Sequence, residues 1–277
     1  MTVSTGNQYF VGARKGYVMA LSTAGYPAAT AGGATAYQGT ELSAIKGFEI
    51  ATPDARRISH NGNDRVAAVD FLPSLEPVTG EIRVAPSLQT LNASLMNVNS
   101  FAVGNVKMMP WQTEDQGTEA DVSLHIWQQS LDRDTKLRSY RSLLIPRARA
   151  IPVRAGMNDN PGEVRYQVIA SPSTKEIWGT SLTTVLEGAT EAAVIEVHSA
   201  QRPKIVTWLA DVAQVAFDLP AAFPSANVVT GYSACWVDGV LLVYGVGAGK
   251  YEFTDADTIT LGTAPGVGKN VVLWYEY

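Results

Sequence analysis

The chain has 277 residues, of which 46% are apolar and 17% charged, and its formal net charge is −5. This balance excludes intrinsic disorder, which requires low hydrophobicity and high charge. A single cysteine excludes a disulfide framework and a cysteine-based zinc site. No run of about 18 apolar residues predicts a transmembrane helix, and residues 1–8 lack the basic and apolar regions of a secretory signal. We therefore expect a soluble, mainly β protein made in the cytoplasm.

The N-terminal part contains a long uncharged segment. No charged residue lies between Lys15 and Glu41, and residues 22–40 are rich in Ala, Gly and Thr. Such a segment is either a flexible loop or an arm that becomes ordered against a partner chain. The lack of charge favours the arm.

Most of the remaining first 200 residues alternate between apolar and polar side chains. Segments 41–50, 78–85, 121–126 and 163–168 all show this period of two, which indicates half-buried antiparallel strands. The sequence His60-Asn61-Gly62-Asn63-Asp64-Arg65 predicts a turn between strands. One segment differs, because Leu88, Leu91 and Leu95 follow Pro86 at helical spacing. It predicts a short helix over about 86–97 that packs on the sheet.

Positive charge is concentrated in residues 132–154, which hold seven basic and two acidic side chains. The rest of the chain is therefore strongly acidic. A tight binder of duplex DNA is more often basic overall, because phosphate neutralisation supplies most of the affinity. A solvated basic strand pair explains the block best, followed by a contact with an acidic patch on a neighbouring copy.

The composition changes near residue 200, after which short strands alternate with Gly and Pro turns. This pattern predicts a small β-sandwich over 201–277, and leaves 1–200 as a separate domain. Its expected private core is apolar and includes Trp236, Val240, Leu242, Ile259, Leu261, Val271 and Leu273. Such a module is expected to lie outward, and a chain that stops near Ala200 is expected to fold and to polymerise without it.

The sequence contains no convincing catalytic, cofactor or metal site. The glycine-rich Gly245-Val246-Gly247-Ala248-Gly249-Lys250 lacks the spacing of a phosphate loop and predicts a hairpin turn. Asp238, Asp255 and Asp257 form no calcium-binding motif, and Cys235 is expected to be a small buried apolar residue. We expect no enzymatic activity, no cofactor and no bound metal.

Two stretches resemble known phage proteins. The first runs through Ala44-Ile45-Lys46-Gly47-Phe48, Pro53-Asp54, the His60 turn, Phe71-Leu72-Pro73 and Gly80-Glu81-Ile82-Arg83-Val84 into the predicted helix. This order of strands and turns is similar to the major tail tube proteins of long-tailed bacteriophages. The second, from Val237-Asp238-Gly239-Val240-Leu241 through Ala264-Pro265 to Val272, resembles immunoglobulin-like β-sandwich segments of phage virion proteins. Together the two stretches cover roughly half of the chain.

The resemblance implies a tail-tube-type β-sandwich or barrel with one short flanking helix, assembled as stacked hexameric rings. In such rings each subunit is expected to lend four strands to a shared inner barrel of about 24 strands, with a backbone diameter of about 50 Å. DNA would pass through this lumen without specific binding, and the other partners would be further copies of the chain and other tail proteins. The expected location is the virion tail, with no insertion into a membrane.

Two sets of residues are assigned roles on this basis. Carboxylates on polar strand faces are expected to line the lumen, so that DNA phosphates slide past: Glu41, Glu49, Glu81, Glu119 and Asp121. The uncharged arm, the 99–118 loop and the basic block are expected to contact neighbouring subunits through Tyr17, Tyr26, Tyr37, Met108, Met109, Trp111, Arg133, Arg138 and Arg141.

Three other classes stay open. A capsid decoration or head–tail connector protein would share the β content and the acidic balance, but would assemble on a shell rather than polymerise. A carbohydrate-binding tail-fibre or adhesin module would expose some of the six Trp and eleven Tyr side chains as stacking platforms. An enzyme is the least supported class, because no catalytic constellation is present.

Overall fold

The computed structural model describes fourteen stretches of the chain: residues 8–10, 14–21, 36–51, 56–62, 65–72, 77–84, 101–103, 106–108, 121–133, 135–154, 164–171, 193–211, 213–223 and 233–277. These stretches contain strands and turns but no helix, so the prediction of a mainly β protein is confirmed. The helix predicted over 86–97 lies outside the described residues.

The described residues from Gln8 to Ser199 form twelve strands, eight of which belong to one sheet. We call this part of the chain the body. The strands of the sheet are β1 (Gln8–Phe10), β2 (Arg14–Ala20), β3 (Thr40–Ala51), β6 (Val78–Val84), β9 (Val122–Asp132), β10 (Arg138–Arg154), β11 (Val164–Ser171) and β12 (Ile195–Ser199). Each of the four segments expected to be strands lies in one of them, namely in β3, β6, β9 and β11. Their order is β1-β9-β2-β3-β6-β11-β10-β12, and β9 also pairs with β10. This extra pairing closes the six strands from β9 through β2, β3, β6 and β11 to β10 into a barrel.

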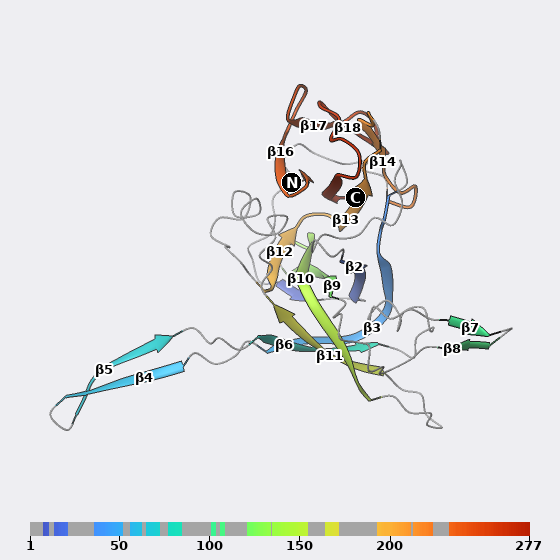
Figure 1. Ribbon diagram of the computed structural model, residues 1–277. Coiled ribbons are helices and arrows are strands. Elements are labelled where there is room, and N and C mark those ends of the chain that lie inside the picture. Colours follow the sequence, from blue (N-terminus) through green and yellow to red (C-terminus); the bar gives the residue numbers. More distant parts are fainter. Residues whose placement is uncertain are drawn as a thin grey trace.

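The barrel is flattened into two layers because two long strands belong to both. We call layer A the part formed by β12, the first half of β10, β9, β2 and the first half of β3. Layer B consists of the second half of β3, β6, β11 and the second half of β10. The register of β3 shifts between Ile45 and Gly47, and that of β10 between Ile145 and Ala148. Bulges of this kind let a strand turn a corner from one sheet to another, and Figure 1 shows β3 turning in this way.

The space between the layers holds the first core. Val18, Leu124 and Ile145 enter it from layer A, and Ile82 and Tyr166 enter it from layer B, all buried. Their strand neighbours point out of the barrel, as a period of two requires. The alternating segments of the sequence therefore have their apolar faces in this core.

The C-terminal residues form a β-sandwich of seven strands: β13 (Pro203–Leu209), β14 (Ala216–Asp218), β15 (Ser233–Val237), β16 (Val240–Tyr244), β17 (Lys250–Phe253), β18 (Thr258–Leu261) and β19 (Asn270–Glu276). Their order is β13-β19-β15-β16-β17-β18-β14. The core between the two halves of the sandwich contains the buried side chains of Trp208, Phe217, Cys235, Ile259 and Leu273. We call residues 203–277 the C-terminal module.

The glycine-rich segment 245–249 differs from the predicted hairpin turn, because the strands it joins, β16 and β17, pair in parallel. Three of its residues, Gly245, Gly247 and Gly249, have positive φ angles of 137°, 116° and 72°. A side chain at any of them would be strained, so the glycines let a short segment reverse the chain twice. The phosphate-loop appearance of this segment is explained by the backbone conformation of the turn.

The module packs on the outward face of layer A through a second apolar layer, which we call the junction. Met19, Leu144 and Ile195 contribute from layer A, and Ile205, Ala234, Trp236 and Val272 contribute from the module. Tyr37, just before β3, adds two backbone hydrogen bonds to Thr207 of β13, with N···O distances of 2.7 and 3.0 Å. Figure 1 shows the module above layer A, with layer B on the far side.

The junction corrects two expectations about the module. Trp236 lies in the junction rather than in the private core, and Val240 is 61% exposed. Removal of the module would expose the apolar side chains of Met19, Leu144 and Ile195 to water, at roughly 25 cal/mol per Å² of apolar surface. A chain that stops near Ala200 would therefore lose the apolar cover of layer A, and its ability to fold and polymerise stays a prediction.

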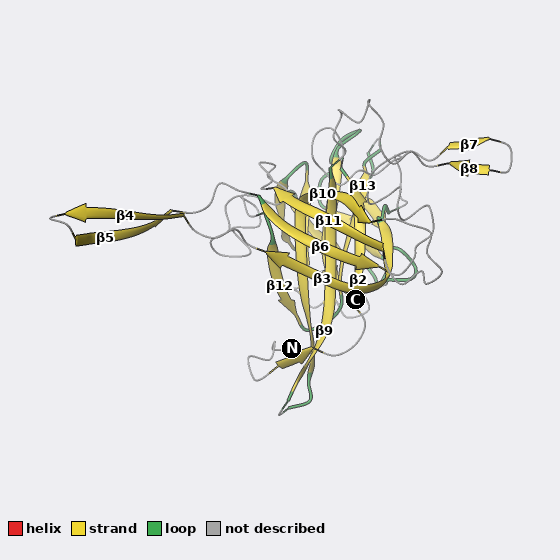
Figure 2. Cartoon of the chain, turned by 90° about the horizontal axis from the view of Figure 1, so that it is seen from below, coloured by secondary structure: helices red, strands yellow, loops and turns green. Residues whose placement is uncertain are grey.

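Two hairpins extend from the body. One consists of β4 (Arg56–Gly62) and β5 (Arg65–Leu72), and the other of β7 (Phe101–Val103) and β8 (Val106–Met108). The first is the turn predicted from the His60 sequence, since Gly62 pairs with Arg65 at its tip. Figure 2 shows the hairpins projecting on opposite sides of layer B.

A substitution at the junction tests its contribution to stability. Trp236→Ala should lower the free energy of unfolding by about 3–5 kcal/mol, because it leaves a large cavity between the two sheets. Val240→Ala on the same strand pair should change it by no more than about 0.5 kcal/mol, because this side chain is exposed. Denaturant unfolding of both variants measures the difference, and equal effects would contradict the assignment of Trp236 to the junction.

Candidate assembly surface

Layer B has two strand edges that carry no partner among the described residues. Strand β3 pairs with β2 only as far as Ile45, and from there on it pairs with β6 alone. Strand β10 pairs with β9 only as far as Ala148, and beyond this point it pairs with β11 alone. Residues 47–51 and 150–154 are thus the two edges of a four-stranded sheet. Pro152 lies in the second edge, and a proline in a sheet is tolerated at such a position.

The two edges run in opposite directions. All pairings within layer B are antiparallel, from β3 to β6, from β6 to β11 and from β11 to β10. Because the number of strands is even, the first and last strands point in opposite ways. The β3 edge of one copy can therefore pair with the β10 edge of another in the same antiparallel pattern that holds layer B together.

The outward face of layer B carries a line of alternating charges. Glu49 of β3 lies opposite Glu81 of β6. Arg83 donates to both carboxylates, from Nε to Glu81 Oε1 at 2.7 Å and from Nη2 to Glu49 Oε1 at 3.2 Å. On β11, Arg165 Nη1 lies 3.8 Å from Glu81 Oε1. The line crosses three strands and ends beside an open hollow of about 470 Å³ at the β3 edge.

A second ion-paired group lies where layer B meets the start of β9. Asp121 accepts a hydrogen bond from Arg149 Nε at 3.0 Å and another from Arg147 Nε. The predicted lumen carboxylates Glu49, Glu81 and Asp121 all lie on the outward side of the barrel, and each has an arginine partner. On this face the three carboxylates are paired with four arginines, so its ion-paired charges are not predominantly acidic.

The other two predicted lumen residues are not part of this group. Glu41 lies in the first half of β3, in layer A, with its carboxylate 3.8 Å from Lys15 Nζ. Glu119 lies outside the described residues. The partner residues Arg83 and Arg165 were not singled out from the sequence, although the same period of two puts Arg83 on the face of Glu81.

The residues predicted to contact neighbouring subunits lie in several different environments. Arg133 and Arg138 are exposed at the turn that joins β9 to β10, Met108 ends β8, and Tyr26, Met109 and Trp111 lie outside the described residues. Arg141 is held within the chain by a bidentate pair with Glu196, with N···O distances of 2.5 and 2.8 Å.

The two remaining tyrosines take part in contacts with the module of the same chain. Tyr17 is 5% exposed and packs edge-on against Phe223. The Tyr37 hydroxyl accepts a hydrogen bond from the Ala20 amide at 3.1 Å, and its backbone bonds Thr207. Tyr17 is therefore inaccessible to a second chain, which corrects the expectation that it lies between subunits.

A buried lysine lies where the module meets the barrel. Lys204 is fully buried, and its Nζ lies 3.2 Å from the ring centroid of Tyr17 and 4.4 Å from that of Phe223. It also donates to the Gln38 carbonyl at 3.3 Å. Burial lowers the pKa of Lys204 to about 7, against the opposing effect of Glu41. Because the unfolded chain keeps a lysine pKa near 10.5, this group adds stability as the pH rises from about 7 towards 10.

His125 is the second buried ionisable group beside this contact. It lies on β9 directly opposite Tyr17 and is 2% exposed, and its Nδ1 has no hydrogen-bond partner among the described residues. Burial and the charge of Lys204 lower its pKa to about 3. The unfolded chain therefore binds a proton between about pH 6.5 and 3 that the folded chain does not bind, and stability falls as the pH falls through this window.

The pH dependence of unfolding tests this assignment. His125→Gln should make the loss of stability between about pH 6.5 and 3 less steep, because one proton no longer distinguishes the two states. His198→Gln is the matched control, since His198 is exposed and lies beside Glu196 at 2.9 Å. Glu276, whose pKa burial raises to about 7, acts in the opposite direction in both variants. An unchanged slope in His125→Gln would reject the role of His125.

The described residues contain no group of three His, Cys, Asp or Glu side chains that could hold a metal ion. They also include no helix of the length and apolar character needed to cross a membrane. No protein-family model matches the chain, and no curated protein matches it.

Proposed function

We propose that this chain is a structural subunit that assembles as hexameric rings stacked into the tail tube of a long-tailed bacteriophage, a conduit for DNA. The observation that carries the proposal is layer B, a four-stranded antiparallel sheet with both edges open and running in opposite directions. A ring forms when the β10 edge of each copy pairs with the β3 edge of the next, because such a head-to-tail contact closes by rotation.

The dimensions of such a ring suit duplex DNA. Six copies of a four-stranded layer give a barrel of about 24 strands, with a backbone diameter of about 50 Å at ordinary strand spacing and tilt. Layer B would face the lumen and the C-terminal module would face outward, because the two lie on opposite sides of layer A (Figure 1). Closure would also leave no open sheet edge in layer B to aggregate.

The two hairpins support stacking of the rings. The β4–β5 hairpin is inserted between the end of β3 and the start of β6, whereas the β7–β8 hairpin follows the end of β6. They therefore leave layer B from opposite ends of its strands, as Figure 2 shows. In a barrel of tilted strands these ends face the rings above and below, so each hairpin can reach a neighbouring ring.

The charge balance of the outward face of layer B is consistent with passage of DNA. Arginines alone would bind phosphates, because counterion release makes such contacts favourable. Here Glu49 and Glu81 pair with Arg83 and Arg165, and Asp121 pairs with both Arg147 and Arg149. We infer that the carboxylates act in the lumen by neutralising arginines of the same wall, rather than by making the wall acidic.

Blocking one edge tests ring formation. Ile151 lies in the β10 edge and is 45% exposed. Ile151→Lys should leave the folded monomer within about 0.5 kcal/mol of its original stability, yet abolish tubes, because a lysine on an open edge opposes strand addition. Val215→Lys, at a 38% exposed position in the C-terminal module, is the matched control.

Electron microscopy of the purified proteins distinguishes the outcomes. Hollow filaments are expected from the original chain and from Val215→Lys, and dispersed subunits from Ile151→Lys. Monomers or closed oligomers of the original chain at all concentrations would reject the tube and favour a decoration or connector protein. Filaments of unchanged bore from Ile151→Lys would reject the pairing of the two edges.

Removal of two charges tests the role of the carboxylates. The double variant Glu49→Gln and Glu81→Gln should still assemble, but its tubes should retain duplex DNA in a salt-dependent way, because Arg83 and Arg165 lose their partners. Glu196→Gln, which removes a carboxylate from layer A, is the control. DNA retention by washed tubes at several salt concentrations measures the effect, and equal retention by all three proteins would reject it.

A further inference from the structure

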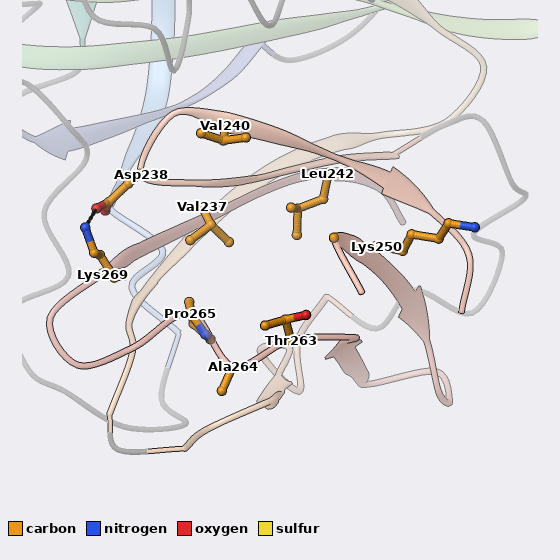
Figure 3. A pocket seen from close by; sticks show the side chains of 10 residues that line it. Val237, Asp238, Val240, Leu242, Lys250, Thr263, Ala264, Pro265 and Lys269 are labelled. Atoms are coloured by element: carbon orange, nitrogen blue, oxygen red, sulfur yellow. Dashed lines mark hydrogen bonds and ion pairs between the residues drawn. The ribbon is translucent and has the colours of Figure 1, made fainter. Parts of the chain in front are cut away.

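The C-terminal module has an open groove of about 340 Å³ beside its private core, because the lining residues Val237 and Leu242 also pack against that core. Figure 3 shows the arrangement of its walls: Asp238 and Lys269 lie at one end, joined by an ion pair of 2.6 Å, and Lys250 extends from the other end. Between them the wall is apolar and consists mainly of Val237, Val240, Leu242 and Pro265. Lys250 forms no ion pair within the described part of the chain, so this end of the groove carries a net positive charge.

Exposed valines occur close in sequence to residues that line the groove, and one of them, Val240, is itself a lining residue. Val240, Val243, Val246 and Val267 are each more than 60% exposed, and they account for most of the exposed large apolar side chains of the described residues. Val240 to Leu242 of β16 pair with β15 on one side, and pairing with β17 begins only at Val243. A concentration of apolar side chains at a strand edge beside a groove is typical of a protein contact.

The turn at the far end of β17 from Lys250 is acidic. The turn between β17 and β18, residues 254–257, carries Asp255 and Asp257, and Asp218 of the neighbouring β14 lies close enough to act on Asp257. Within the described residues none of the three carboxylates pairs with a cation. Asp255 Oδ1 accepts a hydrogen bond from the Asp257 amide at 3.2 Å, so the two acidic residues are held close together. A side-chain hydrogen bond with Asp255, together with its charge, raises the pKa of Asp257.

These two ends have complementary charge and lie about 10 Å apart along β17, since three residue steps separate Lys250 from Phe253. We propose that the groove of one copy binds the acidic turn 254–257 of a second copy of this chain. Lys250 would pair with Asp257, and the exposed valines would cover the short Thr254 and Ala256 side chains. A contact between two different patches can form twice around a two-fold axis or repeat from copy to copy, and both arrangements place Lys250 of one copy beside Asp257 of the other. It involves neither edge of layer B and so does not depend on the proposed tube.

Charge reversal provides the test. Lys250→Glu and Asp257→Lys should each weaken self-association at least about tenfold, because each places like charges across the contact. The double variant should recover most of the affinity, since the pair is restored with its signs exchanged. Lys15→Glu, a reversal at a half-exposed position of layer A, should have no effect. Sedimentation of the full-length proteins at low and high salt measures the association, which should weaken as salt screens the charges.

Disulfide cross-linking locates the contact. A mixture of Lys250→Cys and Asp257→Cys chains should form mixed dimers under mild oxidation, whereas neither variant should do so alone; Cys235 is fully buried and takes no part. A lack of mixed dimers together with no effect of charge reversal would overturn the proposal, as would association that both reversals leave intact. Cross-links without hollow filaments would support this contact and reject the tube. Hollow filaments without cross-links would support the tube and reject this contact.

Discussion

The rest of the structure depends on two bulged strands, β3 and β10. A regular strand alternates its side chains strictly, but the inward residues of β3 are Leu42, Ile45, Phe48 and Ile50, so the spacing changes from three to two. These irregularities let β3 pair first with β2 and then with β6. Without them β3 would remain a central strand of one layer over its whole length. The open edges of layer B, on which any assembly by strand pairing relies, are thus a direct consequence of the bulges.

The junction between the two cores contains buried polar atoms whose hydrogen-bonding capacity is not satisfied. Four polar atoms in or beside it are buried without a hydrogen-bond partner among the described residues: His125 Nδ1, Trp127 Nε1, Ser142 Oγ and Thr207 Oγ1. Each such atom costs about 1–3 kcal/mol relative to a satisfied one, and Lys204 adds the cost of a buried amine. The apolar contacts of Trp236 and Met19 offset these costs. The module is consequently attached to the barrel more weakly than its fully buried interface alone would indicate.

The sequence was sufficient to predict strands and faces, but not their partners. A period of two identified β3, β6, β9 and β11, because half-buried strands must alternate. The same period of two placed Glu49 and Glu81 on the polar faces of their strands. It could not reveal the ion pair between Arg165 of β11 and Glu81 of β6, because these residues are far apart in the chain. Trp236 was assigned to the wrong layer for a related reason. Strand β15 is buried on both faces, by Leu273 on one side and Met19 on the other, so its pattern does not distinguish a private core from a junction.

Geometry limits where contacts between modules can occur in a tube. Layer A lies about 10 Å outside layer B, and the two sheets of the module follow at similar spacing, which puts the module centre about 50 Å from the axis of a 24-strand barrel. Six modules at that radius are about 50 Å apart, whereas a domain of about 77 residues is only about 30 Å across. Modules of one ring therefore cannot touch each other. In a tube the contact between groove and acidic turn must join successive rings, where it would resist their separation or rotation while the bore is closed by layer B alone.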